Sequence, residues 1–284
     1  MNRGLEAELQ EDNRVELIVI GSGTGVPSLR RGSPALAVRA AGRVVLLDLG
    51  AGTLRSMLRH GLNFNEIDIL ALSHRHPDHV GDLVPFLFAT RYALGYSRRQ
   101  PFWLLAARGF AEFLERLKSA FGDWLEPPAG LLQLRELSPD GPDEAAWVGL
   151  RVKSAPTNHI DGSLAFRLEA GSRSLVYSGD TDESDSLAAL AQGADLLILE
   201  AANPIKIPGH LTPAEAGRLA ARAGVQRLLL THFYPSSDEV DVVALASREF
   251  PGEVLRAEDG LRINLENQGA LPQSRSVVSG RDFA

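Results

Sequence analysis

The sequence has 284 residues, of which 44% are hydrophobic, and a formal net charge of −7. This length and composition allow a substantial buried core and exclude a disordered chain or a short-period repeat, so we expect one large domain. Cysteine is absent, which excludes disulfide bonds and leaves His, Asp and Glu to hold any metal ion. The acidic charge argues against a protein that grips a long stretch of RNA, because such proteins usually have a basic face.

The two ends of the sequence differ in composition from its middle. Residues 1–13 are polar and lack the apolar core of a signal peptide, and no later run is long enough to cross a membrane, so we expect a cytoplasmic protein without a membrane partner. Residues 267–284 are also polar, and we expect a disordered tail there. The domain is expected over residues 14–266. The candidates for a local basic patch are Arg30, Arg31, Arg98 and Arg99.

A strand is predicted over residues 15–20, and it leads into the glycine-rich segment 21–27. One interpretation of this segment is a dinucleotide-binding loop, which would have to open a helix whose N-terminus holds a pyrophosphate. Pro27, Gly32 and Pro34 interrupt any helix that starts here. The alternative, which we favour, is a glycine-rich strand exit that lets the backbone pass close to a site.

Two further strands are expected over residues 35–39 and 43–49, followed by a helix over residues 53–60. Asp48 lies at the end of the second of these strands. Its carboxylate could cap the helix, or it could steady a nearby metal-binding histidine through a hydrogen bond, and the residues alone leave both roles open. His60, near the end of the helix, is interpreted as a surface residue favoured by the helix dipole and not as a metal ligand.

An apolar strand is predicted over residues 67–72, and the densest group of metal-binding side chains in the sequence follows it. The group comprises His74, His76, Asp78 and His79. Pro77 interrupts regular structure, so we expect these side chains on a loop at the end of the strand. On an irregular backbone the first two can face one way and the last two another, which suits two adjacent metal ions. A solvated polar turn is the alternative, but it does not explain the spacing.

The spacing of apolar residues predicts helices over residues 82–93 and 110–121, with a strand over residues 102–106 between them. After a break marked by Pro127, Pro128 and Gly130, a second series of short strands is expected. These strands cover residues 131–137, 148–154, 163–169 and 174–178. Two successive halves of strands and helices predict two sheets packed face to face with helices outside, an α/β/β/α sandwich.

Three segments of the second half end in further metal-binding side chains. His159 follows a strand and a proline-led turn, Asp180 follows an apolar strand and a glycine, and His232 follows the apolar residues 228–230. A lone histidine is usually structural, and Asp180 could be an ordinary turn residue. The cluster at residues 74–79 nevertheless requires a further ligand, so we place His159 with it. The residues alone leave the roles of Asp180 and His232 open.

The pattern H-x-H-x-D-H after an apolar strand resembles the signature of the metallo-β-lactamase fold superfamily, and the ribonuclease Z-like branch is the nearest likeness. Segments 21–27, 178–181 and 231–233 resemble further motifs of that branch. The resemblance, which covers about residues 15–265, implies a four-layer metallo-hydrolase domain, a homodimer and a complete ligand set. It places His74, His76 and His159 on one metal, Asp78, His79 and His232 on the other, and Asp180 between them. Zinc is the first choice for both divalent ions, with manganese or iron as alternatives.

A general acid is expected at His210, which lies just before a predicted helix that opens with a capping box. On the residues alone His210 could be an ordinary loop residue. Its H-x-T triplet and Glu200, however, resemble the branch's H-x-T motif and the glutamate of its H-E-A-T segment, although Leu199 and Ala202 replace the His and Thr of that segment. The resemblance implies that His210 and Glu200 are catalytic, together with Asp78.

These residues predict a dinuclear metal-dependent hydrolase in which two ions about 3.5–4 Å apart hold a bridging hydroxide nucleophile and a histidine protonates the leaving group. The predicted substrate is a small or nucleotide-like phosphodiester. Transfer-RNA-processing members of the branch carry a long arm between the segments of His159 and Asp180, where this sequence has about twenty residues. The alternatives are a ribonuclease Z-type tRNA 3′-processing endonuclease without the arm, a thioester or lactone hydrolase, and a non-catalytic metal-stabilised binding protein.

Overall fold

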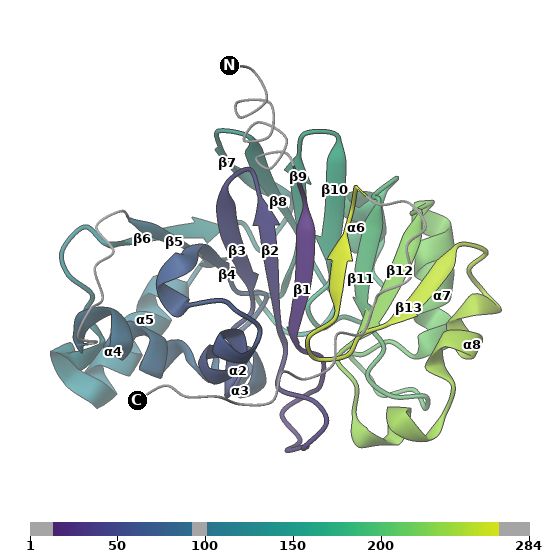
Figure 1. Ribbon diagram of the computed structural model, residues 1–284, viewed down its shortest axis with the longest axis horizontal. Helices are drawn as coiled ribbons and strands as arrows, with labels where there is room; N and C mark the ends of the chain where they lie inside the picture. The colour runs from purple at the N-terminus through teal and green to yellow at the C-terminus, as the bar shows by residue number, and fades with distance from the viewer. Residues whose placement is uncertain (1–13, 93–100, 267–284) are drawn as a thin grey trace.

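The strands of the computed structural model, which describes residues 14–92 and 101–266, form two sheets (Figure 1). Both segments expected at the chain ends, as well as Arg98 and Arg99, lie outside the described residues. The first sheet contains, in spatial order, β14 (Arg262–Asn264), β1 (Glu16–Gly21), β2 (Ala35–Ala40), β3 (Arg43–Leu47), β4 (Ile67–Ala71), β5 (Phe102–Ala107) and β6 (Leu132–Leu137). The second contains β13 (Glu253–Arg256), β12 (Arg227–Thr231), β11 (Leu196–Glu200), β10 (Arg173–Tyr177), β9 (Leu164–Ala170), β8 (Leu150–Pro156) and β7 (Asp143–Trp147).

Strand directions bring several strand ends to one edge of each sheet. Strands β3 to β6 are parallel to one another, as are β10 to β13. Strands β8 and β10 both pair antiparallel with β9, so they run the same way. Residues that follow β3 and β4 therefore come out at one edge of the first sheet, and residues that follow β8, β10, β11 and β12 come out at one edge of the second.

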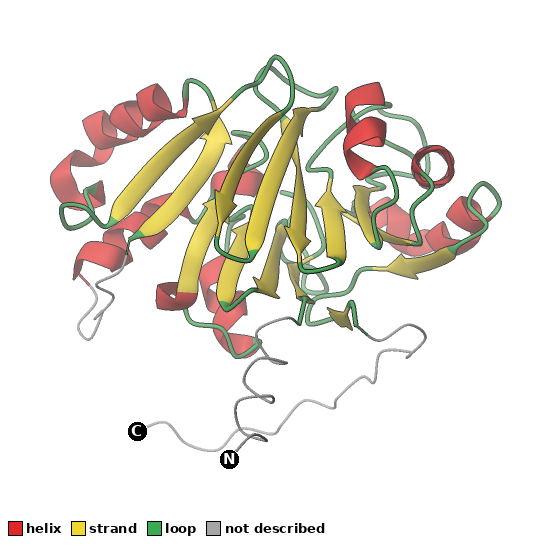
Figure 2. Ribbon diagram, turned by 90° about the horizontal axis from the view of Figure 1, so that it is seen from above, coloured by secondary structure: helices red, strands yellow, loops and turns green. Residues whose placement is uncertain are grey.

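Helices flank the two sheets (Figure 2). In β1, Leu17 and Val19 join the core that includes the second sheet, whereas Ile18 and Ile20 join the core under the helices of the first half. The helices are α2 (Thr53–Arg59), α3 (Pro77–Val80), α4 (Leu83–Tyr92), α5 (Phe110–Phe121), α6 (Asp185–Ala191), α7 (Pro213–Ala223) and α8 (Val242–Ser247), with 3-10 turns η1 (Phe64–Glu66), η2 (Gly122–Leu125) and η3 (Pro235–Glu239). None of the helices described is long and apolar enough to cross a membrane. The predicted α/β/β/α sandwich is confirmed.

One strand was not predicted, and the predicted effect of Pro77 was wrong. Strand β7 was missed, because it is a half-exposed edge strand that begins with two acidic residues and has no apolar run. Pro77 does not exclude a helix from the histidine cluster, since it begins α3. Proline is tolerated at the first position of a helix, where its missing N–H would have no partner. Asp78 and His79 consequently lie on one helical turn instead of a loop.

Candidate metal centre

The side chains predicted to bind metal lie together near the ends of the strands, the usual place for a site in α/β folds. They form two groups, in each of which the potential ligand atoms lie within 4.8 Å of one another. The first group contains His74, His76, His159 and Asp180, and the second contains Asp78, His79 and His232. The structure thus brings together all the side chains that the sequence predicts as metal ligands.

The first group has the spacing of one ligand shell. His76 Nδ1 lies 3.0 Å from His74 Nε2 and 3.1 Å from His159 Nε2. Asp180 Oδ2 lies 3.7 Å from the Nε2 atoms of both His74 and His159. Ligand atoms at the usual zinc–nitrogen distance of about 2.0–2.1 Å in a tetrahedral shell would be about 3.3 Å apart. The spacing of the four atoms therefore suits the tetrahedral coordination of a single ion.

The second group is completed by the other oxygen of Asp180. His79 Nε2 lies 3.3 Å from His232 Nε2 and 3.2 Å from Asp180 Oδ1, which in turn lies 3.3 Å from His232 Nε2. Asp78 Oδ2 lies 3.9 Å and 3.6 Å from these two imidazole nitrogens. Asp180 Oδ1 is buried and has no hydrogen-bond partner in the described part of the chain. A buried, unpaired oxygen that faces imidazole nitrogens fits a site for a cation.

Contacts behind the predicted ligands fix the orientation of their rings. His74 Nδ1 lies 3.0 Å from Ser73 Oγ, and His159 Nδ1 donates a hydrogen bond of 2.9 Å to the carbonyl of Gly209. These contacts leave Nε2 of each imidazole to face the other ligand atoms. A hydrogen bond at one ring nitrogen selects the tautomer that binds metal through the other.

Asp48 orients His79. The carboxylate is fully buried and accepts hydrogen bonds from His79 Nδ1 (2.7 Å), from Ser73 N and Oγ (2.7 and 2.8 Å) and from the Tyr177 hydroxyl (2.6 Å). Asp82 caps α2 in its place. Of the two roles that the sequence left open for Asp48, the contact with the histidine is therefore the one found in the structure.

Sequence reasoning missed Ser73, Tyr177 and Gly209 as supports of the centre. Tyr177 ends a buried apolar strand, and a buried phenol normally needs a hydrogen-bond acceptor, so its position was an available signal. Ser73 directly precedes His74. Gly209 acts through its carbonyl, and no residue type marks such a contact in a sequence.

The charges in the centre favour metal binding. Burial alone would lower the pKa of His79. The carboxylates of Asp180 and Asp48 together have the larger, opposite effect and raise this pKa well above its usual value. Burial and the neighbouring His79 lower the pKa of His74 to about 2, which keeps this imidazole neutral. Burial would raise the pKa of Asp78 and Asp180, yet nearby histidines hold both below their usual range. The carboxylates that favour a proton on His79 also favour a metal cation, and a metal bound at Nε2 would displace that proton, because neutral imidazoles and ionised carboxylates are the forms that bind divalent metals.

His210 lies beside the second group and contacts Glu200 as predicted. Its ring is stacked on that of His232, with centroids 5.8 Å apart and planes inclined by 11°. His210 Nδ1 lies 2.9 Å from Oε1 of Glu200, which is fully buried. Burial would lower the pKa of His210, but the hydrogen bond to Glu200 raises it. The imidazole therefore keeps its proton to a higher pH than a free histidine does, which suits a proton donor.

The contact between Asp48 and His79 leads to a test of the centre. We expect Asp48→Asn to weaken metal binding by about 10–100-fold, because loss of the charge behind a metal-binding histidine makes it a poorer ligand. Competition with a chelator measures this affinity. Asp195→Asn is the matched control, since Asp195 is also a buried carboxylate but its contacts are with Ser174, Arg173 and Gln226. Equal affinities in the two variants would contradict the orienting role.

Residues 43–233 match the family described as Beta-lactamase superfamily domain. A ribonuclease Z from Mycobacterium sp. (strain KMS) is 31% identical to this chain, over 88% of this chain and 96% of the relative. The metallo-beta-lactamase fold protein YhfI from Bacillus subtilis, a solved structure, has a TM-score of 0.75 and 25% identity over 89% of this chain and 99% of that one. The short form of human tRNase Z shares the fold, with a TM-score of 0.70 and 24% identity over 87% and 98% of the two chains.

Proposed function

Because this chain belongs to the β-lactamase superfamily, in its ribonuclease Z-like branch of metal-dependent hydrolases, we propose that it hydrolyses phosphodiester bonds at the candidate metal centre. The observation that carries the proposal is the pair of ligand groups joined by the two oxygens of Asp180, with His210 beside them. Two divalent ions held there would supply an activated water and neutralise charge on the phosphate oxygens. We propose zinc, with manganese or iron as alternatives, because imidazole and carboxylate donors suit all three.

His210 and Glu200 provide the proton that the leaving oxygen of a phosphodiester needs. Glu200 holds Nδ1 of His210, so the opposite ring nitrogen is free to donate to a substrate. Glu200 Oε1 also accepts a hydrogen bond of 2.7 Å from the N–H of Thr181, which fixes the carboxylate behind the imidazole. A thiolate leaves without such help, and the pair therefore favours a phosphodiester over a thioester.

Two sources bear on the class of substrate, namely the relatives of this chain and its own charge and connections. Relatives named ribonuclease Z favour RNA, and they do not support ranking RNA below a small phosphodiester. The net charge of −7 and the connection from His159 to Asp180, which is a turn followed by the hairpin of β9 and β10, favour a smaller molecule. RNA and cyclic nucleotides both contain a phosphodiester next to a ribose, and we propose that this is the bond cleaved.

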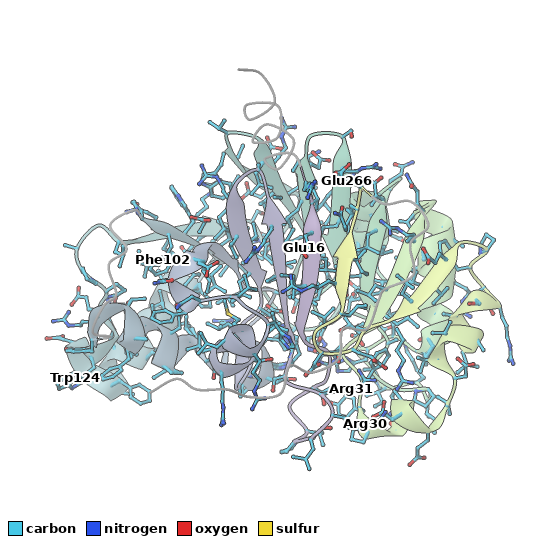
Figure 3. All side chains as sticks on the ribbon, in the orientation of Figure 1. Glu16, Arg30, Arg31, Phe102, Trp124 and Glu266 are labelled. Carbon is cyan, nitrogen blue, oxygen red and sulfur yellow. The ribbon has the colours of Figure 1, made fainter. Side chains whose placement is uncertain are left out.

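The two described arginines of the suggested basic patch lie in the loop after β1 (Figure 3). Arg31 is buried, and its guanidinium donates hydrogen bonds to Asp238, to Ser22 and to the carbonyl of Ala257. Arg30 lies 3.5 Å from Asp238 and is largely exposed. The hydrogen bonds of Arg31 therefore stabilise the fold, and of these two arginines only Arg30 is exposed enough to contact a substrate.

We expect binding to a precursor transfer RNA to be weak at physiological salt, with a Kd of about 10⁻⁶ M or higher, and to weaken steeply as salt rises. The reason is that no arm is present between β9 and β10 and the chain is acidic. A filter-binding titration over a range of salt measures this. Tight binding with accurate cleavage at the 3′ trailer would overturn the prediction and make tRNA 3′ processing the function.

A panel of substrates tests the class of reaction. The metal-loaded protein would be assayed with a bis-nitrophenyl phosphodiester, a cyclic nucleotide, a precursor transfer RNA, a thioester and a lactone. We expect hydrolysis of phosphodiesters. Activity confined to the thioester or the lactone would contradict the proposal, and inactivity on all five with both metals bound would indicate a metal-stabilised binding protein.

We further propose a homodimer, which the family resemblance implies, and a cytoplasmic location, which follows from the composition of the sequence. The exposed rings of Phe88, Tyr92 and Trp124 pack on one another, with centroids 4.8 and 5.0 Å apart along the series, and form an apolar face that a second copy would shield from water. Sedimentation velocity tests the dimer, which should have about twice the 30.6 kDa mass of one chain.

A further inference from the structure

The loop between β11 and α7 carries His210. The ammonium group of Lys206, in the same loop, donates hydrogen bonds to three different segments. Lys206 Nζ donates hydrogen bonds to Asp182 Oδ1 (2.5 Å), to the carbonyl of His210 (2.9 Å) and to Glu215 Oε2 (3.1 Å). Glu215 belongs to the capping box of α7. One cation therefore joins the segment just after Asp180, the backbone of His210 and the first turn of α7.

The carboxylate of Asp182 that accepts from Lys206 also holds the backbone of Gly209, next to His210. Asp182 Oδ2 accepts a hydrogen bond of 3.2 Å from the N–H of Gly209, while the Gly209 carbonyl accepts the hydrogen bond of His159 Nδ1. The backbone of Gly209 has φ of +83°, and an added Cβ would lie 3.1 Å from His159 Nδ1. The loop must therefore keep this conformation for the carbonyl to reach His159.

Loss of the ammonium would disturb the loop, because two carboxylates depend on it. Asp182 and Glu215 both accept hydrogen bonds from Lys206, and their side chains are 32% and 16% exposed. Without a cation between them, two ionised carboxylates would repel each other and push the loop apart.

We propose that Lys206 is a positioning residue for the reaction, which sets the place of the His210 side chain and of the Gly209 carbonyl behind His159. The ammonium donates to none of the predicted metal ligands, so it acts through the backbone of the loop. The part that concerns His210 rests on the proposed function, because it takes His210 as the proton donor.

Lys206→Met tests this role. We expect it to slow hydrolysis of an alkyl phosphodiester by about 10–100-fold, since a displacement of about 1 Å can have that effect. A bis-nitrophenyl ester should be affected less, because nitrophenolate leaves without a proton. Lys206→Arg keeps a cation and should restore most of the rate. Lys153→Met is the matched control, because Lys153 pairs with Glu169 and is 34% exposed, close to the 40% of Lys206.

A second variant separates this proposal from the proposed function. At saturating metal, combining Lys206→Met with His210→Ala should slow the alkyl ester no more than His210→Ala alone, because the first change displaces the proton donor that the second removes. Additive losses, or equal losses on both esters, would overturn the role of Lys206 at His210. If His210→Ala itself did not distinguish the esters, the proposed function would fail instead. Removal of metal by a chelator should still be faster in Lys206→Met, and an unchanged rate would overturn the role at Gly209 and His159.

Discussion

His210→Ala is expected to slow the hydrolysis of an alkyl phosphodiester by about 10²–10⁴-fold, and to slow the hydrolysis of a bis-nitrophenyl ester much less. An alkoxide requires a proton as it leaves, whereas nitrophenolate does not. Both metals should remain bound, because His210 is outside the predicted ligand set. Glu200→Gln should show the same selectivity more mildly, since the amide oxygen can still accept a hydrogen bond from His210 Nδ1 but carries no charge.

The other outcomes of the His210 experiment each point to a different role. Equal losses on both esters, with the metals retained, would indicate that His210 binds the phosphate and does not protonate the leaving group. Loss of one metal would make His210 a ligand, which its position within 4.8 Å of Asp180 and His232 allows. No loss on either ester would make it an ordinary loop residue.

His76→Ala is expected to slow both reactions alike, by more than about 100-fold, because it removes a member of the first ligand group. His76 Nδ1 lies 3.0 Å from His74 Nε2 and 3.1 Å from His159 Nε2. Rates on the two esters and the metal content of the variant are the measurements. A loss on the alkyl ester alone, with both metals retained, would contradict the role of His76 as a ligand.

His60→Ala is the matched control for both histidine variants. His60 follows α2 and belongs to neither ligand group, so the same chemical change is made away from the centre. It should leave metal content and both rates unchanged. A comparable loss in His60→Ala would show that the effects of the other variants come from general destabilisation.

The fold and the grouping of the predicted ligands could be predicted because a simple local pattern marks them. Apart from the segment of His159, each predicted ligand segment follows an apolar strand that is parallel to a neighbouring strand, and carboxyl ends of parallel strands meet at one edge of a sheet. The motif from His74 to His79 and the positions of Asp180 and His232 all have this form. Polar residues placed directly after buried strands thus carried most of the information about the centre.

The parts that could not be predicted depend on partners distant in the sequence. Arg31 was a candidate for a surface patch, yet its partners Asp238 and Ala257 lie 207 and 226 residues away. A charged residue becomes buried only when the fold supplies such partners. The contact of the Gly209 carbonyl with His159 and the contacts of Lys206 could not be predicted either, because they depend on the path of the backbone.

The metal content of the purified and metal-reconstituted protein tests the central claim most directly. We expect elemental analysis to find about two ions per chain in the parent protein and fewer in Asp180→Ala, because the two oxygens of Asp180 face different ligand groups. A ratio below one in the parent after reconstitution, with Asp180→Ala no different from it, would contradict the shared centre.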